Sequence, residues 1–396
     1  MRRAAGLIRA GELVAVPTET VYGLAGNGLD EDAVKKIYEV KGRPEVKPLS
    51  LMVSSSEDMD KYCTDVPQDA VYLAERFWPG PLTVVLRSKP SVPEIVRAGG
   101  STVALRCPDH KMTLELIKLS GLPLAAPSAN PSGEESPKTA EKVKEYFDGK
   151  ISGIIDGGPC RMGTESTIID MSTDSYRILR HGALSDEDIK NALAENMEII
   201  GITGGTGCGK TTALESLEKR GALIIDCDRV YHELLDSDKD MLGEIEERFP
   251  EAFTDGVFKR HDLGYIVFSD AEALEDLNVI THKYVIREVK RILGDYAMQG
   301  GRLAALDAAE LICSGLSALC DFTVGITADK KIRMERIMKR DGIPAEYALM
   351  RINAQRPMEY YEENCSCTLC NNGSREEFIN NFAELIKEAE NNGRKR

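Results

Sequence analysis

The sequence has few aromatic residues, no excess of positive charge and no hydrophobic run long enough for a membrane span. Its 396 residues are 42% hydrophobic, 6% aromatic and 29% charged, whereas a membrane helix needs about 20 consecutive apolar residues. The formal net charge is −15, with −5 on residues 1–196 and −10 on the rest, which argues against broad binding to nucleic acid. Any positive patch is therefore expected to be local, as at a nucleotide pocket.

Targeting signals and a disulfide framework are also missing. Arg2 and Arg3 are not followed by the apolar segment of a secretory signal. The ten cysteines do not follow the spacing of a small disulfide-rich domain, so we expect reduced thiols in a cytoplasmic protein. Cys365, Cys367 and Cys370 form a C-x-C-x-x-C cluster. It is either a metal site lacking a nearby fourth ligand or a group of partly buried thiols.

The hydrophobic pattern divides the chain near residue 196. Before that point, β-like runs alternate with helix-like segments, which predicts an α/β domain with a twisted mixed sheet. The β-like runs are residues 13–16, 49–53, 82–86, 103–105, 154–155 and 167–169, and the helix-like segments are residues 32–40, 69–76, 112–120 and 139–147. A short helix with Ser185 as its N-cap is expected over residues 185–196. We expect one domain at 1–190, a short linker at 191–197 and a second domain at 198–396.

The stretch from Gly204 to Thr211 reads G-x-x-x-x-G-K-T and directly follows an apolar run, which is the context of a phosphate-binding loop. Its glycines let backbone N–H groups turn toward an anion, and a helix beginning near Lys210 adds its positive end. We expect Lys210 to reach the β- and γ-phosphates of ATP, and Thr211 to bind Mg²⁺. The predicted nucleotide-binding residues of this half are Gly204, Gly205, Gly207, Gly209, Lys210, Thr211 and Thr212.

The second half is expected to form a doubly wound parallel sheet of the P-loop NTPase type. Its strand candidates are residues 198–203, 223–225, 303–306 and 322–326, and parallel strands place ligands at their carboxyl ends. Asp226 and Asp228 end the second of these strands, and Asp307 ends the third. We expect Asp226 and Asp307 to organise Mg²⁺ together with Thr211. Taken singly, each aspartate is also explained as a helix N-cap or turn residue.

Further motifs follow the loop in a fixed order: GALIIDCDRVYHELL (221–235), LGYIVF (263–268), LEDLNVITH (274–282), RMERIMKRDG (333–342), RINAQ (351–355) and NNG (371–373). With the loop they resemble dephospho-CoA kinase over residues 198–390. The resemblance implies transfer of the ATP γ-phosphoryl group to the ribose 3′-hydroxyl of dephospho-CoA. Asp228 would accept the hydroxyl proton, and Lys210 would contact the phosphates. Arg336 and Arg340, on a lid helix, would stabilise the transferring phosphoryl group.

Departures from that kinase pattern lie on the acceptor side and at the last strand. They are Cys313, Lys283 and Ser366. A degenerate kinase that serves as a nucleotide sensor therefore stays open as an alternative for this half.

The first half carries a second ordered set of motifs. They are VPTETVYGLAG (16–26), KGRPEVKPLSLMV (41–53), FWPGPLTVVL (77–86), STVALRCP (101–108), LAAPSANPSG (124–133), GTESTIID (163–170) and ILRHG (178–182). Lys41 and Arg43 alone indicate only a cationic loop, which is commonly a solvated face. The whole order resembles the YrdC-type domain of threonylcarbamoyl-AMP synthases over residues 3–190.

This second resemblance implies that threonine and bicarbonate form N-carboxy-threonine, whose carboxylate attacks the ATP α-phosphate and expels pyrophosphate. Such a reaction needs an anion-lined pocket more than a nucleophilic side chain. The resemblance assigns threonine binding to Thr20, Arg106 and Ser166, and ATP binding to Lys41, Arg43, Lys47, Thr102, Ser128, Ser136 and Arg180. Met52 stands where many members have histidine, and Lys47 replaces a usual asparagine.

Together the two resemblances imply a bifunctional enzyme that uses ATP and Mg²⁺ in both halves. The first product would serve the t6A modification of tRNA, with the threonylcarbamoyl transferase as the direct partner and no required contact with tRNA or membrane. Two alternatives stay open for the first half. One is an RNA-binding module, and the other is a carbamoyl-adenylate enzyme that uses carbamoyl phosphate.

Overall fold

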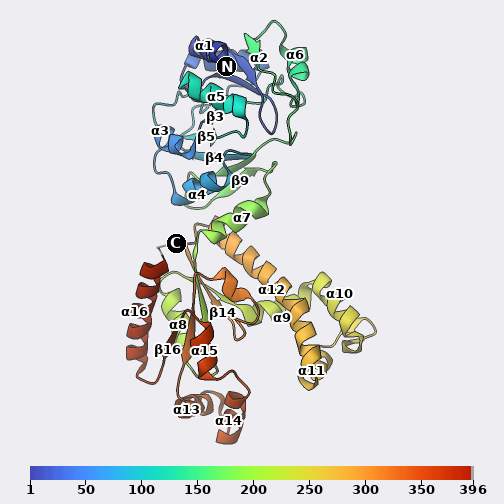
Figure 1. Ribbon diagram of the computed structural model, residues 1–396, viewed down its shortest axis with the longest axis vertical. Coiled ribbons are helices and arrows are strands. Elements are labelled where there is room, and N and C mark those ends of the chain that lie inside the picture. The colour runs from blue at the N-terminus through green and yellow to red at the C-terminus, as the bar shows by residue number, and fades with distance from the viewer. Residues whose placement is uncertain (394–396) are drawn as a thin grey trace. The chain divides into compact units, whose positions relative to one another are not determined.

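The structure is a computed structural model that describes residues 1–393 (Figure 1). The chain separates into two compact units. The first unit is Met1–Leu193 with Met298–Gly300, and the second is Ala194–Ala297 with the residues from Gly301 onward. Within the described residues, no helix is both long enough and apolar enough to cross a membrane.

A nine-stranded mixed sheet forms the first unit, in the order β7-β1-β2-β6-β3-β5-β4-β8-β9. The strands are β1 (Val14–Val16), β2 (Gly23–Asn27), β3 (Ser50–Met52), β4 (Leu82–Arg87), β5 (Thr102–Arg106), β6 (Leu124–Ala125), β7 (Gly153–Ile154), β8 (Thr167–Asp170) and β9 (Arg177–Arg180). Three neighbouring pairs are parallel, β1–β7, β3–β5 and β4–β8, and the others are antiparallel. The predicted mixed sheet is confirmed.

Seven helices accompany this sheet in the described sequence before the second sheet begins. They are α1 (Arg2–Arg9), α2 (Glu31–Lys41), α3 (Met59–Tyr62), α4 (Gln68–Phe77), α5 (Lys111–Ser120), α6 (Ala140–Phe147) and α7 (Asp186–Glu195). The Asp30 side chain caps α2 by accepting two backbone N–H groups, and Gly42 ends it at φ 58°, a conformation that favours glycine. This end of α2 brings Lys41 and Arg43 to the part of the sheet where a cavity lies.

Two strands of the first unit lacked a hydrophobic pattern in the sequence. β2 reads GLAGN. Neighbouring side chains lie close to Gly26, inside the strand, and to Gly28, just after it. A Cβ at Gly28 would lie 2.4 Å from the Leu51 side chain, and one at Gly26 would lie 2.9 Å from Leu13. β9 reads RILR and is only half-buried. Close backbone approach in β2 and solvent exposure in β9 explain why alternation did not reveal them.

The second unit contains a five-stranded sheet in the order β11-β14-β10-β15-β16. Its strands are β10 (Glu198–Thr203), β11 (Leu223–Asp226), β14 (Leu303–Asp307), β15 (Phe322–Thr327) and β16 (Cys367–Cys370), and all neighbouring pairs are parallel. One face packs against α8 (Lys210–Glu218) and α16 (Arg375–Gly393) through a common apolar cluster. α9 (Cys227–Ser237) and α15 (Met358–Asn364) also contact the strands. The predicted parallel sheet is confirmed.

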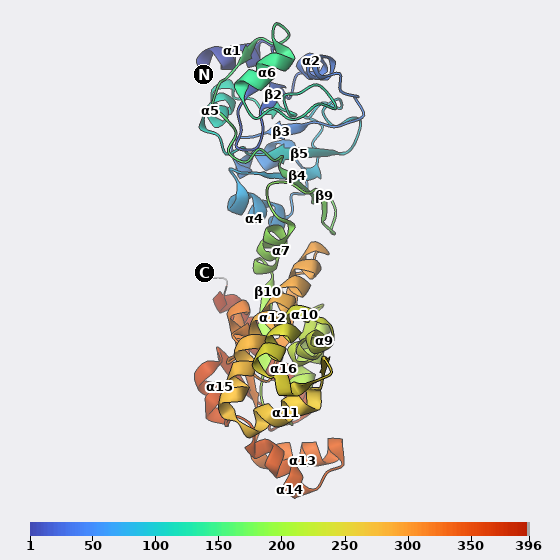
Figure 2. The same ribbon diagram turned by 90° about the vertical axis from the view of Figure 1, so that its right-hand side faces the viewer.

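The remaining elements of the second unit extend from the sheet. They are α10 (Lys239–Arg248), the hairpin β12 (Phe253–Thr254) and β13 (Val257–Phe258), α11 (Arg260–Ser269), α12 (Ala271–Met298), α13 (Lys330–Asp341) and α14 (Ala345–Asn353). α13 and α14 lie side by side (Figure 2) and share a small apolar core around Ile337 and Ile352.

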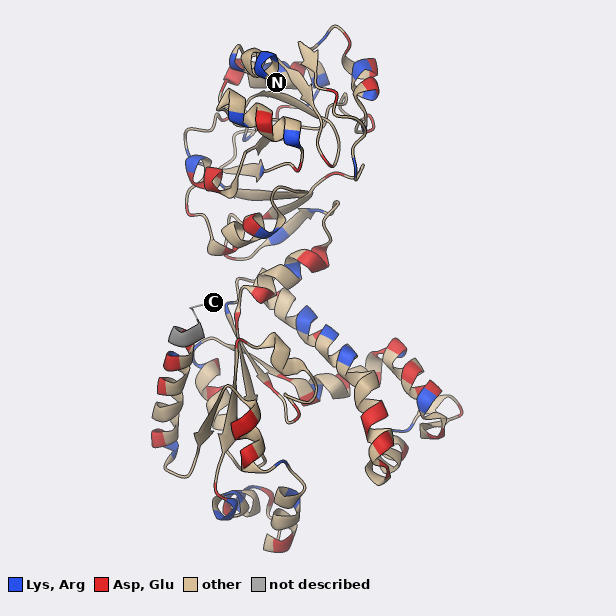
Figure 3. Ribbon diagram, viewed as in Figure 1, with Lys and Arg blue, Asp and Glu red and all other residues tan. Residues whose placement is uncertain are grey.

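Acidic and basic residues are interspersed on the helices of both units (Figure 3). The basic residues of α12 illustrate what this does to local charge. Lys283 pairs with Glu244, Arg287 pairs with Asp238, and Arg291 pairs with acidic residues of α12 itself. The positive charge of these three residues is therefore neutralised locally.

Candidate active sites

A cavity of about 340 Å³ lies in the first unit, between β2, β3, β5 and β9. Five residues predicted to bind threonine or ATP line it: Arg43, Arg106, Ser128, Ser166 and Arg180. Met52, on β3, is buried in the same wall. The motifs are spread over about 140 residues of sequence, and the sheet brings them to one cavity.

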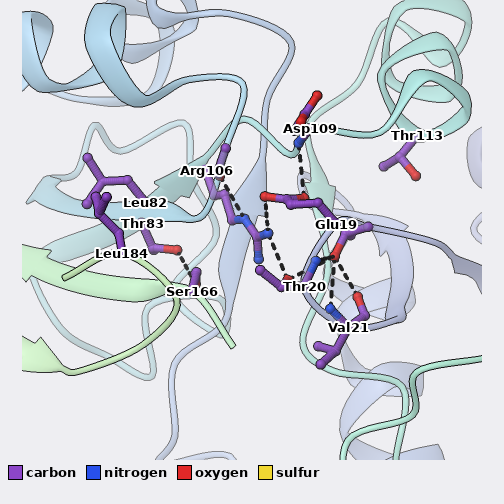
Figure 4. Close-up of polar contacts among 12 residues, drawn as sticks. Glu19, Thr20, Val21, Leu82, Thr83, Arg106, Asp109, Thr113, Ser166 and Leu184 are labelled. Atoms are coloured by element: carbon purple, nitrogen blue, oxygen red, sulfur yellow. Dashed lines mark hydrogen bonds and ion pairs between the residues drawn. The ribbon is translucent and has the colours of Figure 1, made fainter. Parts of the chain in front are cut away.

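Arg106, on β5, lies in the wall of this cavity and is almost buried (Figure 4). Its Nη2 donates to Glu19 Oε1 and to Thr20 Oγ1, both at 2.8 Å, and its Nε donates to the Gly80 carbonyl at 3.4 Å. The second carboxylate oxygen of Glu19 accepts the Asp109 N–H at 3.0 Å. Thr20 and Arg106 were both predicted to bind threonine and are in contact. Glu19 was not predicted.

Ser166 belongs to a second hydrogen-bonded group in the same wall. Its Oγ lies 2.8 Å from Thr83 Oγ1, as Figure 4 shows, and accepts a hydrogen bond from Arg180 Nη2 at 3.0 Å. Arg180 also pairs with Glu165, whose carboxylate accepts the Ser136 hydroxyl at 2.9 Å. Glu165 therefore joins two predicted ATP ligands, Arg180 and Ser136, and Arg180 also contacts the predicted threonine ligand Ser166. Glu165 lies in the sequence motif GTESTIID, but the motif alone did not assign it a role.

Lys41 lies beside the cavity instead of lining it. The residue is 3% exposed, and its Nζ donates to the backbone carbonyls of Ser128 and Asn130. Burial lowers the pKa of Lys41 to about 8, and the nearby charge of Arg43 acts in the same direction. In this arrangement the ammonium group connects the end of α2 to the Ser128–Asn130 loop.

The other predicted ATP ligands of the first unit differ in their positions. Arg43 lines the cavity and donates to the carbonyls of Lys47 and Pro48, at 3.3 and 3.0 Å. Lys47 itself is exposed. Thr102 begins β5 and shares a face with Arg106, since side chains alternate along a strand, but it does not line the cavity.

The phosphate-loop motif of the second unit forms the turn between β10 and α8. Three of its glycines have backbone angles that favour glycine, with φ 143° at Gly204, 78° at Gly207 and 105° at Gly209. Lys210 begins α8, and Thr211 and Thr212 follow in its first turn. The loop thus has a helix N-terminus directly behind it, which is the arrangement that binds phosphate.

Three aspartates lie at the carboxyl ends of β11 and β14. Asp226 and Asp307 are neighbours in the register of the two strands, and Lys210 Nζ lies 3.5 Å from Asp307 Oδ1. Asp226 also caps α9 by accepting the Arg229 N–H at 2.9 Å. Burial raises the pKa values of Asp228 and Asp307, whereas the Lys210 charge opposes both shifts.

A magnesium ion bound with ATP fits this end of the sheet. The Thr211 hydroxyl and the Asp226 and Asp307 carboxylates offer the oxygen ligands that Mg²⁺ prefers. When bound, the ion would neutralise phosphate charge. Of these residues, Asp307 is the one whose carboxylate lies near the Lys210 ammonium group.

Residues more than 120 positions away hold the tip of the phosphate loop. Gln355 Oε1 accepts the Thr206 N–H at 2.8 Å and an Arg333 Nη2 hydrogen at 2.6 Å, and Arg333 Nε donates to the Thr206 carbonyl at 3.0 Å. A Cβ at Gly205 would lie 2.3 Å from Arg333 Nη2, so a side chain there would require Arg333 to move. Sequence reasoning had found the RINAQ motif without assigning Gln355 a function.

The NNG motif contacts the other side of the loop. Asn371 Nδ2 donates to the Cys208 carbonyl at 2.8 Å, and Asn371 Oδ1 accepts a hydrogen bond from Arg336 Nη2 at 3.3 Å. Arg336 also donates to the Gly207 carbonyl at 3.3 Å. Arg340 pairs with Asp341 next to it. Both arginines lie on α13, and both contact the loop, since Arg340 Nη2 also donates to Thr206 Oγ1 at 3.4 Å.

A larger cavity, of about 410 Å³, borders Asp228. Most of its wall is apolar and comes from α9, α11 and α12, whereas its polar end contains Asp228, His232 and Arg260. Arg260 Nη2 contacts His232 Nε2 at 2.8 Å. A largely apolar cavity with a carboxylate in its wall is suited to an acceptor that presents a hydroxyl group.

The three positions that depart from the kinase pattern have local partners. Cys313 Sγ lies 3.0 Å from the Tyr360 hydroxyl, Lys283 pairs with Glu244, and Ser366 Oγ accepts the Thr323 N–H at 3.0 Å. Ser366 thereby helps to attach β16 to β15.

The cysteine cluster is divided between the two faces of the second sheet. Cys367 packs with the apolar cluster under α8 and α16, whereas Cys365 lies near Gly325 on the opposite face. Cys370 is exposed. Across residues 1–393, no group of three or more His, Cys, Asp or Glu side chains is arranged to hold a metal ion.

Each half of the chain matches a known protein family. Residues 6–182 match the family of Sua5, YciO and YrdC proteins, whose description is "Telomere recombination". Residues 198–377 match the family described as "Dephospho-CoA kinase". Each match covers one of the two sheets together with its candidate site.

Curated relatives match the first half of the chain. A threonylcarbamoyl-AMP synthase of Pyrococcus abyssi is 51% identical over 195 residues, covering 49% of this chain and 57% of that protein. One of Bacillus subtilis is 49% identical over 189 residues, covering 48% and 55%. The chain thus spans little more than half the length of these two relatives.

A shorter relative is matched along most of its length. The putative threonylcarbamoyl-AMP synthase of Mycobacterium tuberculosis H37Rv is 35% identical over 190 residues, which cover 48% of this chain and 87% of that protein. Through its first unit, the chain therefore belongs to the threonylcarbamoyl-AMP synthase family. Its second unit matches the dephospho-CoA kinase family.

Proposed function

We propose that the chain is a bifunctional enzyme. Its first unit forms L-threonylcarbamoyl-AMP from threonine, bicarbonate and ATP, and its second unit phosphorylates the 3′-hydroxyl of dephospho-CoA with ATP. The observation that carries the proposal is that each unit has its own cavity with its own cationic side chains, Arg106 and Arg180 in the first and Arg260 in the second. Each cavity is built from the motifs of a different family.

In the first unit, the substrate supplies its own nucleophile. The carboxylate of N-carboxy-threonine attacks the α-phosphorus of ATP, the bond to the β-phosphate oxygen breaks, and pyrophosphate leaves. Arg106, Thr20 and Ser166 would hold the amino acid, whereas Arg43, Arg180 and the Ser128 region would hold ATP. Their role is to orient two anions and to stabilise the charge that develops at phosphorus.

In the second unit, the 3′-hydroxyl oxygen attacks the γ-phosphorus and ADP leaves. Asp228 is proposed to accept the hydroxyl proton, since it lies where the acceptor cavity meets the sheet and burial raises its pKa. Lys210 and the loop N–H groups would contact the β- and γ-phosphates. Arg336 would stabilise the transferring group from α13, with Arg340 on the same helix.

The two products place the chain in two different processes. Threonylcarbamoyl-AMP would pass to the transferase that modifies tRNA, so this chain need not bind tRNA itself. We place both reactions in the cytoplasm, which suits ten cysteines that are all free thiols. ATP with Mg²⁺ is the cofactor requirement of both units in this proposal.

One assay tests both activities. The purified full-length chain receives ATP and Mg²⁺, with dephospho-CoA in one sample and threonine plus bicarbonate in another, and ADP and pyrophosphate are measured separately. ADP that requires dephospho-CoA, together with pyrophosphate that requires threonine, supports two working enzymes. Pyrophosphate without ADP would indicate that the second unit is a nucleotide sensor and not a working kinase. ATP–pyrophosphate exchange without threonine would favour carbamoyl phosphate as the substrate.

A further inference from the structure

A buried ion pair joins Arg106, in the wall of the first cavity, to Glu19 behind it. The Glu19 and Arg106 side chains are 1% and 8% exposed, with 2.8 Å between Glu19 Oε1 and Arg106 Nη2. The other oxygen of Glu19 accepts the Asp109 N–H at 3.0 Å, as Figure 4 shows. Each carboxylate oxygen thus has a donor inside the protein, and Glu19 does not line the cavity.

The pair determines which edge of Arg106 is offered to a ligand. A guanidinium group is planar, and its five N–H donors have fixed directions. Nη2 is directed at Glu19 and Thr20, and Nε is directed at the Gly80 carbonyl. Since Arg106 lines the cavity, its Nη1 edge is the part left to meet a substrate anion.

We propose that Glu19 is a positioning residue, which holds Arg106 so that its Nη1 edge meets the carboxylate of the amino-acid substrate. Glu19 itself touches no substrate. The inference rests on the function proposed for the first unit, and it adds a residue that acts through Arg106. Without the Glu19 charge, the buried guanidinium would turn toward other acceptors, and the geometry of carboxylate binding would be lost.

The backbone of the same turn has separate contacts that a side-chain substitution leaves in place. The Glu19 carbonyl accepts the Met162 N–H at 2.8 Å, and the Thr20 carbonyl accepts the Gly163 N–H at 3.0 Å. These bonds attach the turn to the segment that carries Glu165 and Ser166. A change confined to the Glu19 carboxylate therefore tests the orientation of Arg106 more than the path of the chain.

Glu19→Gln is the informative variant. Glutamine has nearly the same shape, but one of its two terminal groups is an NH₂ donor. That donor must face either the Asp109 N–H or the Arg106 Nη2 hydrogens, so both existing hydrogen bonds cannot be kept. Asp58→Asn is the matched control, because Asp58 is a buried carboxylate of the same unit that accepts the Ser54 N–H and pairs with Lys61 away from the cavity.

The measurement uses the full-length chain and compares threonine and ATP binding by calorimetry in the wild type and both variants. We expect Glu19→Gln to weaken threonine binding by about 10- to 100-fold while ATP binding stays unchanged, and Asp58→Asn to change neither. Unchanged threonine binding in folded Glu19→Gln would overturn the proposal. If Glu19→Gln does not fold, Glu19→Asp, which keeps the charge on a shorter stem, is measured in its place.

A second readout separates this inference from the function itself. Hydrogen exchange of the Arg106 Nε–H, followed by ¹⁵N NMR without any ligand, reports whether the guanidinium is held. Faster exchange in Glu19→Gln supports positioning even if the wild type binds no threonine, a result that would refute only the proposed substrate. Equal exchange in the two proteins refutes the positioning role, whatever the substrate is.

Discussion

Replacing Gly209 by alanine should stop the second activity while leaving the fold and the first activity intact. Gly209 precedes α8 with φ 105°, and an added Cβ would lie 2.2 Å from Asn371 Nδ2. That amide donates to the Cys208 carbonyl at 2.8 Å and is buried. The new methyl group must therefore displace Asn371 and move the loop N–H groups that face phosphate.

A matched control in the same unit separates the two contributions to the loss of stability, backbone strain and the lost hydrogen bond. Gly221 has φ 88°, and an added Cβ there would have no atom within 4 Å. Alanine at either position adopts an unfavourable backbone conformation, at about 1–2 kcal/mol. Only Gly209→Ala also loses the hydrogen bond from Asn371 to Cys208, which adds about 0.5–1.5 kcal/mol. The free energies of unfolding of the two variants should thus differ by only about 1 kcal/mol.

Activity should differ far more, because misplacing reacting groups by about 1 Å costs on the order of 100-fold in rate. The assay is dephospho-CoA-dependent ADP formation, with thermal unfolding to confirm folding and threonine-dependent pyrophosphate release as an internal control. We expect a loss of about 100-fold or more in Gly209→Ala and near-normal turnover in Gly221→Ala. Similar ADP formation in the two variants would refute the reasoning that Asn371 and the loop must keep their present contact.

Three further outcomes follow from the two sites. Lys210→Ala should abolish ADP formation and leave pyrophosphate release unchanged, Arg43→Ala should do the converse, and loss of both activities in either folded variant would contradict separate sites. Asp228→Asn should lower the kinase turnover number by about 100-fold or more, the usual contribution of a general base, with little change in the KM for ATP; an unchanged turnover number would rule Asp228 out as the base. Pyrophosphate release should fall as the pH rises through about 8, where Lys41 loses its proton and its hold on the Ser128 loop, and kinase activity measured in the same samples is the control. Since the pKa of Lys41 is lowered in the folded state, the unfolded chain binds more protons between about pH 8 and 10.4. The contribution of Lys41 to the free energy of unfolding should therefore rise with pH in that window, whereas pyrophosphate release should fall. A fall of both the free energy of unfolding and pyrophosphate release would contradict the lowered pKa of Lys41.

Much of the fold was predictable because its strands are continuous apolar runs. β10 was expected over residues 198–203 and occupies that range, and β11, β14 and β15 differ from expectation by one residue at an end. β2 was not predictable, since Gly26 within it and Gly28 just after it are needed for close approach to Leu13 and Leu51 and not for a hydrophobic face. A strand that packs through the backbone of its glycines shows no periodic pattern of apolar residues in the sequence.

The candidate sites were also predictable only in part. The phosphate loop was predictable because its chemistry lies in one contiguous segment, whereas the contacts of Gln355 and Asn371 with it join residues about 150 positions apart. Lys41 was assigned to ATP binding by the resemblance to threonylcarbamoyl-AMP synthases, because Lys41 and Arg43 alone indicate only a cationic loop. Its ammonium group instead lies among backbone carbonyls, since tertiary packing decides where a flexible charged side chain ends. The roles assigned to individual residues remain predictions for the assays above.

The contact of Asn371 with the phosphate loop has a consequence for how the chain is made. Gly209 leaves the ribosome about 160 residues before Asn371 does, which at roughly 5–20 residues per second is a delay of about 8–32 s. Throughout that interval the strand before the loop exists, but β16 and the asparagine after it do not. Nascent chains should thus gain nucleotide binding only after Asn371 has been synthesised, long after residues 1–193. Early termination anywhere in the last thirty residues before Asn371 would release a protein with a complete first unit and an unfinished phosphate loop.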